Sequence, residues 1–470
     1  MIYETEEELL EKAIAAEGSS FEELDKKGRL NNAKSKGGLG HIIEESYFGY
    51  EVNSNAAPDF EELGIELKVT PFKINKNGTV SSKERLVLNI INYMEEVQCS
   101  FFTSSFWNKN QKILLMLYKW LPNAERKDYQ IYKSLLYTFP EADLEIIKQD
   151  WETIINKIKA GKAHELSEGD TNYLGACPKG ANKKSLRKQP YSEIPAMQRA
   201  YALKQSYMTA LYRKIIKKEE LVSFSKKEEL HKLSFEKILE NRFKDYIGMS
   251  DIQIAETLDI EYNRKAKSSI ALLISALLGI KGTRLDKIEE FSKANIQFKT
   301  IRLEPNGLPR EHMSFENIRF DEWVNEEWED SSAREKFVTT KFLFVVFQYN
   351  ETKSENPDRL PHLKGIQLWN MPLQIIDNEV KGIYGEVNRL MQVGLDLKVK
   401  KYGKTTRQEN NFPKANFNGV AHVRPKAKDR KDTVTLPTGQ VVTKQCLWLN
   451  REFVAGVLDK TCGNKSRENP

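Results

Sequence analysis

The feature that most limits how this chain can fold is an internal repeat at a shift of about 230 residues. Residues 59–68 align with 290–299, and the apolar run 113–118 aligns with 342–347. Within the first pair, Gly-Ile-Glu-Leu-Lys in one copy corresponds to Asn-Ile-Gln-Phe-Lys in the other. A shift of this length corresponds to a whole domain. The fold proposed for one half of the chain therefore has to suit the other half as well.

The periodicity of apolar residues predicts the architecture of each copy. In the first copy, helical spacing covers 40–48 and 144–158, whereas residues 64–72 alternate as in a half-exposed strand. The continuous apolar run 113–118 is typical of a buried strand. The dipeptide Asn77-Gly78 predicts a type I′ hairpin turn, since both central positions of that turn take positive φ. We therefore expect α/β domains in tandem, each a mixed sheet flanked by helices.

A charged stretch without strong apolar periodicity marks the predicted joint between the copies. We expect a catalytic domain over 1–215, a linker over 216–232 and a second domain over 233–470. The alternative is one continuous helix that bridges the two copies.

Composition excludes several classes of protein. Hydrophobic residues make up 40% of the chain and charged residues 30%, as in globular proteins, and no apolar run approaches the roughly 20 residues that span a bilayer. The acidic N-terminus lacks the basic-then-apolar order of a secretory signal, so we expect a cytoplasmic protein. The four cysteines form no CxxC pair, which argues against a zinc site. A net charge of +6 permits nucleic-acid binding without requiring it.

Three residues of the first copy have the spacing of a metal-dependent phosphodiesterase site. Asp59 and Glu66 offer carboxylates to Mg²⁺, a hard cation that prefers oxygen ligands. Glu66 and Lys68 are two apart on the predicted strand, so their side chains share a face. Leu67 points to the other face, and its backbone carbonyl is a third candidate metal ligand. Lys68 can orient or help to deprotonate a water molecule. The alternative is three surface charges on an amphipathic strand.

Several separate blocks carry a resemblance to known nucleases. Residues 36–44 and 59–68 resemble the mismatch-repair endonuclease MutH. Five further blocks are similar to the two-domain type II restriction endonucleases that cut GATC: 81–93, 149–151, 161–169, 179–187 and 198–204. Agreement in several independent blocks is less probable by chance than agreement in one. The resemblance therefore supports a nuclease more strongly than the spacing of the three candidate catalytic residues does.

The resemblance implies two tandem MutH-like domains of the PD-(D/E)xK type. Asp59 and Glu66 would be metal ligands and Lys68 the water-orienting residue. Glu44, from the preceding helix, would be an auxiliary catalytic acid; the alternative is a solvated helix residue. In the second copy, the positions of Asp59 and Glu66 hold Glu290 and Gln297.

The position of Glu44 holds Ser275, so only Lys299 survives in the second copy, as the counterpart of Lys68. Glutamine is a neutral and weaker Mg²⁺ ligand, so the second copy should not assemble a metal site. The family precedent implies a second domain that binds another GATC site as an effector.

In the family, a loop near the end of the domain reads the DNA groove. Lysine and arginine neutralise phosphates, asparagine bonds adenine and arginine bonds guanine. Here Cys177 stands where MutH has an arginine, so base-specific roles in this loop stay open. Tyr201 could equally be a core aromatic residue. The DNA-binding candidates are Lys179, Gly180, Asn182, Lys183, Lys184, Arg187, Tyr201 and Lys204 in the first copy, and Arg424, Pro425 and Lys426 in the second.

The predicted partner is double-stranded DNA containing GATC. Cutting both strands of a palindrome needs two active sites, so we expect a monomer that dimerises on DNA. The leading hypothesis is a Mg²⁺-dependent type II restriction endonuclease. The alternatives are a MutH-like repair nickase, which would have one domain, and a non-catalytic GATC-binding regulator.

Overall fold

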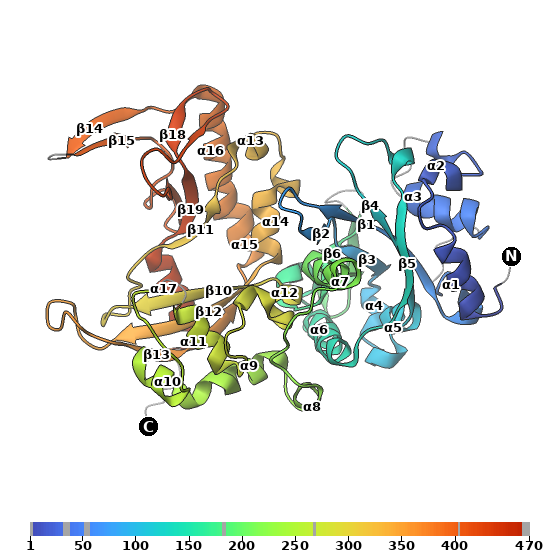
Figure 1. The fold of residues 1–470 in the computed structure, drawn as a ribbon, viewed down its shortest axis with the longest axis horizontal. Helices are drawn as coiled ribbons and strands as arrows, with labels where there is room; N and C mark the ends of the chain where they lie inside the picture. Colours follow the sequence, from blue (N-terminus) through green and yellow to red (C-terminus); the bar gives the residue numbers. More distant parts are fainter. Residues whose placement is uncertain are drawn as a thin grey trace. The chain divides into compact units, whose positions relative to one another are not determined.

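A computed structural model describes the chain over residues 3–31, 38–50, 57–180, 185–266, 269–402 and 405–462. The chain forms two compact units (Figure 1). Unit 1 comprises Met1–Ile238 and Asp286–Asn295, and unit 2 comprises Leu239–Leu285 and Ile296–Pro470. Across the described residues, no helix is both long and apolar enough to cross a membrane.

The main sheet of unit 1 has four strands in the order β2-β1-β4-β5. They are β1 (Glu66–Ile74), β2 (Val80–Ser82), β4 (Ile113–Lys119) and β5 (Ile131–Tyr137). Strands β1 and β4 are parallel, and the other neighbours are antiparallel. Both strands predicted from periodicity are confirmed, and β4 is buried over its first five residues as its continuous apolar run requires.

The turn between β1 and β2 differs from the prediction. A hairpin is present, but only Gly78 has positive φ, at 77°, and Asn77 does not. The Gly78 N–H donates to the carbonyl of Asn75 at 2.8 Å, and the Asn75 N–H donates to Thr79 at 2.9 Å. The loop is therefore a longer turn with glycine in the left-handed position, so the type I′ prediction was wrong. The Asn77-Gly78 dipeptide correctly predicts a hairpin, but the type of turn depends on the length of the loop between β1 and β2.

One face of this sheet packs against the N-terminal helices. The helices are α1 (Glu6–Ile14), α2 (Phe21–Leu24), α3 (Gly38–His41) and the π-helical segment η2 (Ile42–Tyr47). Their core includes Leu9, Phe21 and Ile42 with Leu67 and Leu114 of the sheet. The predicted helix over 40–48 is thus confirmed, with a π-helical turn in place of regular α geometry. The even-numbered residues of β1, including Glu66 and Lys68, point to the opposite face.

A second, smaller sheet carries the later motif blocks of unit 1. Its strands run in the order β3-β9-β6, all antiparallel: β3 (Leu86–Ile90), β9 (Arg199–Leu203) and β6 (Leu174–Pro178). The hairpin β7 (Leu186–Gln189) and β8 (Ser192–Met197) follows β6. Two longer helices belong to this unit, α6 (Glu141–Lys159) and α7 (Gln205–Lys217). Helix α6 confirms the periodicity over 144–158.

Unit 2 repeats the main sheet with the same pairing. Strand β10 (Ile296–Leu303) is parallel to β12 (Lys341–Tyr349), which is antiparallel to β13 (Pro361–Trp369). Gln297 pairs with Phe342 as Glu66 pairs with Ile113, so the register agrees between the copies at the catalytic position. The predicted tandem α/β fold is confirmed, and the structure adds that the two copies share this strand register.

The smaller sheet is repeated as well. Its strands run in the order β11-β19-β16, again antiparallel: β11 (Met313–Asn317), β19 (Gln445–Leu449) and β16 (Ala421–Pro425). The hairpin β17 (Thr433–Thr435) and β18 (Val441–Thr443) follows β16 as β7 and β8 follow β6. The longer helices of this half are α11 (Ser269–Leu277), α16 (Lys381–Val393) and α17 (Arg451–Cys462).

The remaining α-helices and strands are short. They are α4 (Tyr93–Glu96), α5 (Ser105–Asn110), α8 (Lys227–Leu230), α9 (Phe235–Phe243), α10 (Asp251–Thr257), α12 (Glu289–Ala294), α13 (Phe320–Trp323), α14 (Ser332–Thr339), α15 (Leu373–Ile375), β14 (Lys398–Tyr402) and β15 (Thr405–Glu409).

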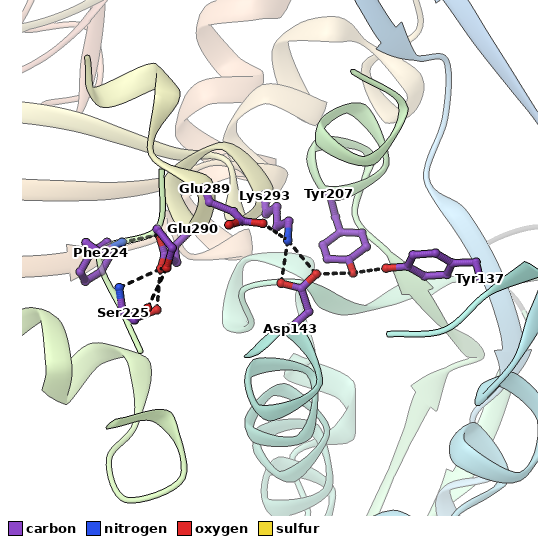
Figure 2. A network of polar contacts seen from close by, with 9 residues as sticks. Tyr137, Asp143, Tyr207, Phe224, Ser225, Glu289, Glu290 and Lys293 are labelled. Atoms are coloured by element: carbon purple, nitrogen blue, oxygen red, sulfur yellow. Dashed lines mark hydrogen bonds and ion pairs between the residues drawn. The ribbon is translucent and has the colours of Figure 1, made fainter. Parts of the chain in front are cut away.

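Helix α12 follows the first part of unit 2 in sequence but packs within unit 1, against α7. Lys293 of α12 is nearly buried, and its Nζ donates to both oxygens of Asp143 at 2.6 and 2.7 Å and to Glu289 at 2.6 Å (Figure 2). The hydroxyl of Tyr207 donates to Asp143 at 2.8 Å. Burial opposes the charge on Lys293, but Asp143 and Glu289 hold its pKa above the ordinary value. This buried ion pair fixes α12 to α6.

We predict that Lys293→Met destabilises unit 1 by about 3–5 kcal/mol, because Asp143 keeps a buried charge without its cation. The matched control is Lys133→Met, which removes a half-exposed ion pair with Glu17 at 3.3 Å and should cost no more than about 1 kcal/mol. Urea unfolding of both variants measures the difference. Equal shifts of the unfolding midpoint would contradict the role given to the buried pair.

Candidate active site

The six residues between Asp59 and Glu66 form a closed loop that sets the spacing of the motif. Phe60 and Ile65 exchange both backbone hydrogen bonds, at 2.9 and 3.2 Å, around the 3₁₀ turn η3 (Glu61–Leu63). Gly64 ends that turn with φ 64°, a left-handed conformation that favours glycine. The chain therefore folds back, so that Asp59 lies beside the start of β1.

Hydrogen bonds hold Asp59 against the edge of β1. The Leu67 N–H donates to Oδ2 of Asp59 at 2.9 Å, and the Asp59 N–H donates to Oε2 of Glu66 at 3.2 Å. Strand β2 pairs with β1 only from Phe72 onward, so it leaves this edge uncovered at Leu67. In a strand, the N–H and C=O of one residue point to the same edge, so the Leu67 carbonyl lies on the side of Asp59.

Glu66 is a buried carboxylate with two lysines beside it. Its side chain is only 3% exposed, and Lys68 donates to Oε1 at 2.7 Å. Lys109 lies 3.6 Å from Oε2. Burial raises the pKa of Glu66, while Lys68 and Lys109 lower it and Asp59 raises it further. The predicted triplet is thus brought together, and it forms a compact cluster of opposite charges instead of three separate surface charges.

Glu44 lies in the π-helical segment η2 and is half-buried. Burial raises its pKa to about 7, and repulsion from Asp59 and Glu66 adds to the effect while Lys68 opposes it. The charges of Asp59, Glu66 and Lys68 therefore act on Glu44 as well. The alternative of a solvated helix residue therefore does not describe its environment.

The donor chemistry of the site suits a hard cation. Asp59, Glu66 and the Leu67 carbonyl offer only oxygen atoms, which are the ligands that Mg²⁺ prefers. Burial raises the pKa of both Glu44 and Glu66, and repulsion from Asp59 adds to each shift; a positive ion bound beside Asp59 would relieve that repulsion. Among the described residues, no group of three or more His, Cys, Asp or Glu side chains could by itself hold a metal ion. The candidate ligand set therefore needs the backbone carbonyl.

Two residues of the site escaped the sequence analysis. The hydroxyl of Tyr50 donates to Oδ1 of Asp59 at 2.9 Å, and Lys109 of α5 approaches Glu66. Lys109 is 43 positions beyond Glu66 in the numbering, and nothing in its local sequence links it to the motif. Only the pairing of β1 with β4, which follows α5, brings it near.

The predicted DNA-reading loop of unit 1 is partly described. Lys179 and Gly180 are exposed just beyond β6. Arg187 is exposed on β7, where its Nε donates to Gln198 at 2.6 Å. The remaining candidates of this loop lie outside the described residues: Asn182, Lys183 and Lys184.

Tyr201 and Lys204 do not lie on the surface. Tyr201 is fully buried, and its hydroxyl donates to Glu96 at 3.0 Å. Lys204 is 3% exposed, and its Nζ donates to the carbonyl of Thr171 at 2.5 Å. Of the two interpretations of Tyr201, its burial supports the core aromatic residue. Neither side chain is presented to DNA in this conformation.

The counterparts in the second copy have other partners. Glu290 belongs to α12 and therefore to unit 1, where its carboxylate accepts hydrogen bonds from Ser223 and from the N–H and hydroxyl of Ser225 (Figure 2). Gln297 and Lys299 lie on β10 in unit 2. Ser275 is buried, and its hydroxyl donates to the carbonyl of Leu272. The carboxylate that corresponds to Asp59 thus anchors the linker.

The candidates Arg424, Pro425 and Lys426 are exposed at the end of β16. The Arg424 guanidinium lies 5.7 Å from the ring centre of Trp448, which fixes its direction. Pro178 occupies the corresponding end of β6. Both copies therefore present the proline-lysine segment at the same point of the smaller sheet.

A repeated mixed sheet, with an acidic pair and a lysine at one strand edge, defines a MutH-like fold of the PD-(D/E)xK type. The family model of the DNA mismatch repair enzyme MutH matches residues 48–150 and 283–379. The chain is 36% identical to the type II restriction enzyme Sau3AI of Staphylococcus aureus, over 96% of this chain and 98% of that protein.

Single-domain relatives match a smaller part of the chain. The MutH proteins of Pasteurella multocida and Shewanella woodyi are 32% and 31% identical, over 40% and 39% of this chain and 83% and 78% of their own lengths. The chain therefore belongs to the MutH-like nuclease family, and it shares its full two-domain length with a restriction enzyme of that family.

We predict that Tyr50→Phe lowers the rate of DNA cleavage roughly 10- to 100-fold, because it removes a hydrogen bond that orients Asp59. Tyr47→Phe is the control, since Tyr47 lies nearby in sequence but donates to the carbonyl of Lys12 at 2.6 Å. The Mg²⁺ concentration for half-maximal cleavage should rise in the first variant only. Identical Mg²⁺ titrations for both variants would rule out the orienting role of Tyr50.

Proposed function

We propose that this protein is a Mg²⁺-dependent type II restriction endonuclease that hydrolyses phosphodiester bonds in double-stranded DNA at GATC. The observation that carries the proposal is the cluster of Asp59, Glu66 and Lys68 on the uncovered edge of β1. The similarity to Sau3AI over both domains supports the restriction class.

The residues of the cluster have separate roles in the proposed reaction. Asp59, Glu66 and the Leu67 carbonyl would hold Mg²⁺, which lowers the pKa of a bound water and stabilises negative charge on the scissile phosphate. Lys68 donates to Glu66 and is placed to orient the attacking water. Glu44 lies in the field of Asp59 and Glu66 and would be the auxiliary catalytic acid. Tyr50 keeps the Asp59 carboxylate in place.

The second domain is proposed to bind another GATC site as an allosteric effector. It keeps the exposed Arg424 and Lys426, whereas Gln297 gives it no second carboxylate beside Lys299. One chain then offers one active site, so cutting both strands of a palindrome requires two chains on the DNA. The proposed enzyme is a monomer that dimerises there, with Mg²⁺ as cofactor.

Two other functions have less support. A repair nickase of the MutH kind would need one domain, and the MutH proteins cover only two fifths of this chain. A non-catalytic regulator would not need the buried Glu66, whose charge is costly to maintain.

We expect Asp59→Ala, Glu66→Ala and Lys68→Ala each to reduce cleavage to background while DNA binding in Ca²⁺ is retained. Glu62→Ala is the matched control, because this exposed acid lies within the same loop but makes no contact with the cluster in the described structure. Gel-based cleavage and binding assays give both readouts. Cleavage by all three variants at the wild-type rate would disprove the site.

Plasmids with one or two GATC sites test the specificity and the effector role. The two-site plasmid should be cut faster per site, cleavage should map to GATC, and EDTA should stop it. The full chain has to be used, since a truncation after the first domain would remove α12 and leave Asp143 without Lys293. Equal rates per site on both plasmids would contradict coupling, and ends outside GATC would contradict the specificity.

A further inference from the structure

A basic cavity of about 510 Å³ lies in unit 2, and Lys299, the counterpart of Lys68, is among the residues that line it. Its walls come from residues 262–266, from the start of α11, from β10 and from the segment that follows the Asn306-Gly307 turn. Five of its lining residues are cationic and one, Glu311, is acidic. The cationic residues are Arg264, Lys265, Lys299, Arg302 and Arg310.

Two arginines face each other across the hairpin that borders this cavity. Leu303 and Pro309 form an antiparallel bridge, and the Arg310 N–H donates to the carbonyl of Arg302 at 2.8 Å. Arg302 and Arg310 are therefore directly opposite, and like charges in that position are destabilising. Both are exposed, and the carboxylate of Glu304, whose pKa Arg310 helps to lower, is near Arg310. The hairpin thus presents two arginines side by side at the border of the cavity.

The corresponding hairpin in unit 1, as far as the structure describes it, carries no such pair of arginines. There the residues of β1 face serine or valine: Phe72 faces Ser82, Lys73 faces Ser81 and Ile74 faces Val80. The opposed arginines are therefore a feature of the second copy and do not follow from the shared fold.

The field inside the cavity is positive as well. Burial lowers the pKa of Lys299 to about 8, and the nearby Lys426 lowers it further, against Glu316. The Nζ of Lys299 donates to the carbonyl of Ser314 at 2.8 Å, and Lys426 donates to the next carbonyl, that of Phe315. Lys426, in the segment at the end of β16, thus lies near Lys299, a residue that lines the cavity. A basic surface of this extent suits a polyanion better than a single small ion.

We propose that this cavity binds a phosphodiester of the DNA backbone, with Arg302 and Arg310 as the principal contacts. The inference rests on the proposed binding of DNA by the second domain. The cavity would hold the DNA backbone, beside the segment of Arg424, Pro425 and Lys426 that is proposed to read the bases. Arginine suits the role because its planar guanidinium donates two parallel hydrogen bonds to phosphate.

The test compares the salt dependence of DNA binding by the full chain in Ca²⁺. Each phosphate contact contributes about 0.9 to the slope of log affinity against log salt concentration. The double variant Arg302→Gln/Arg310→Gln should lower that slope by about 1–2. It should weaken binding to a GATC duplex and to a scrambled duplex by the same factor, because backbone contacts carry no sequence information.

The matched control is Arg319→Gln/Arg389→Gln, which removes the same charge from two exposed arginines that pair with Glu322 and Glu386 outside the cavity. Its slope should equal that of the wild type. The charge-preserving variant Arg302→Lys/Arg310→Lys should keep most of the slope, which separates charge from folding.

An unchanged slope for the glutamine variant would overturn the proposal. Inorganic phosphate is the second probe, and thermal unfolding measures its effect. If phosphate stabilises the wild type and not the glutamine variant while the DNA slope is unchanged, the cavity is a small-anion site and the DNA assignment is wrong. Failure of the proposed function would look different, because the wild type would then bind GATC and scrambled duplexes equally.

Discussion

The buried carboxylate of Glu66 is the constraint on which the site of the first domain depends. Removing a charged group from water is costly unless cations and hydrogen-bond donors replace the solvent. Lys68, Lys109 and the backbone N–H of Asp59 supply them. Lys109 lies on α5, the helix that precedes β4, and Asp59 lies at the start of the closed loop that precedes β1. The parallel pairing of β1 with β4 therefore assembles the site as well as the sheet.

The second copy keeps that pairing and removes the charge. Gln297 occupies the register of Glu66, so nothing at this point of β10 requires two lysines for compensation. Lys299 remains and is buried enough for its pKa to fall to about 8. Around it the chain carries cations in place of carboxylates. One backbone design thus supports an acidic site suited to a metal ion and a basic cavity suited to a phosphate.

Helix α12 shows how the repeat was adapted. In the first copy the corresponding segment carries Asp59 to the strand edge. In the second copy it carries Glu290 to the linker serines and Lys293 to Asp143 (Figure 2). The chain therefore returns to unit 1 after it has begun unit 2. The stability of the catalytic unit depends on residues from the second half of the sequence, although the active site does not.

Local patterns in the sequence were enough to predict the repeat, the alternating strand of Glu66 and Lys68, the buried strand 113–118 and the loss of carboxylates in the second copy. Each depends on local periodicity or on comparing two aligned segments. Tertiary structure alone decided the contacts of Tyr50 and Lys109, the burial of Tyr201 and Lys204, and the place of α12. The physical reason is that local pattern fixes which face a side chain takes, whereas burial and partners depend on segments distant in the chain.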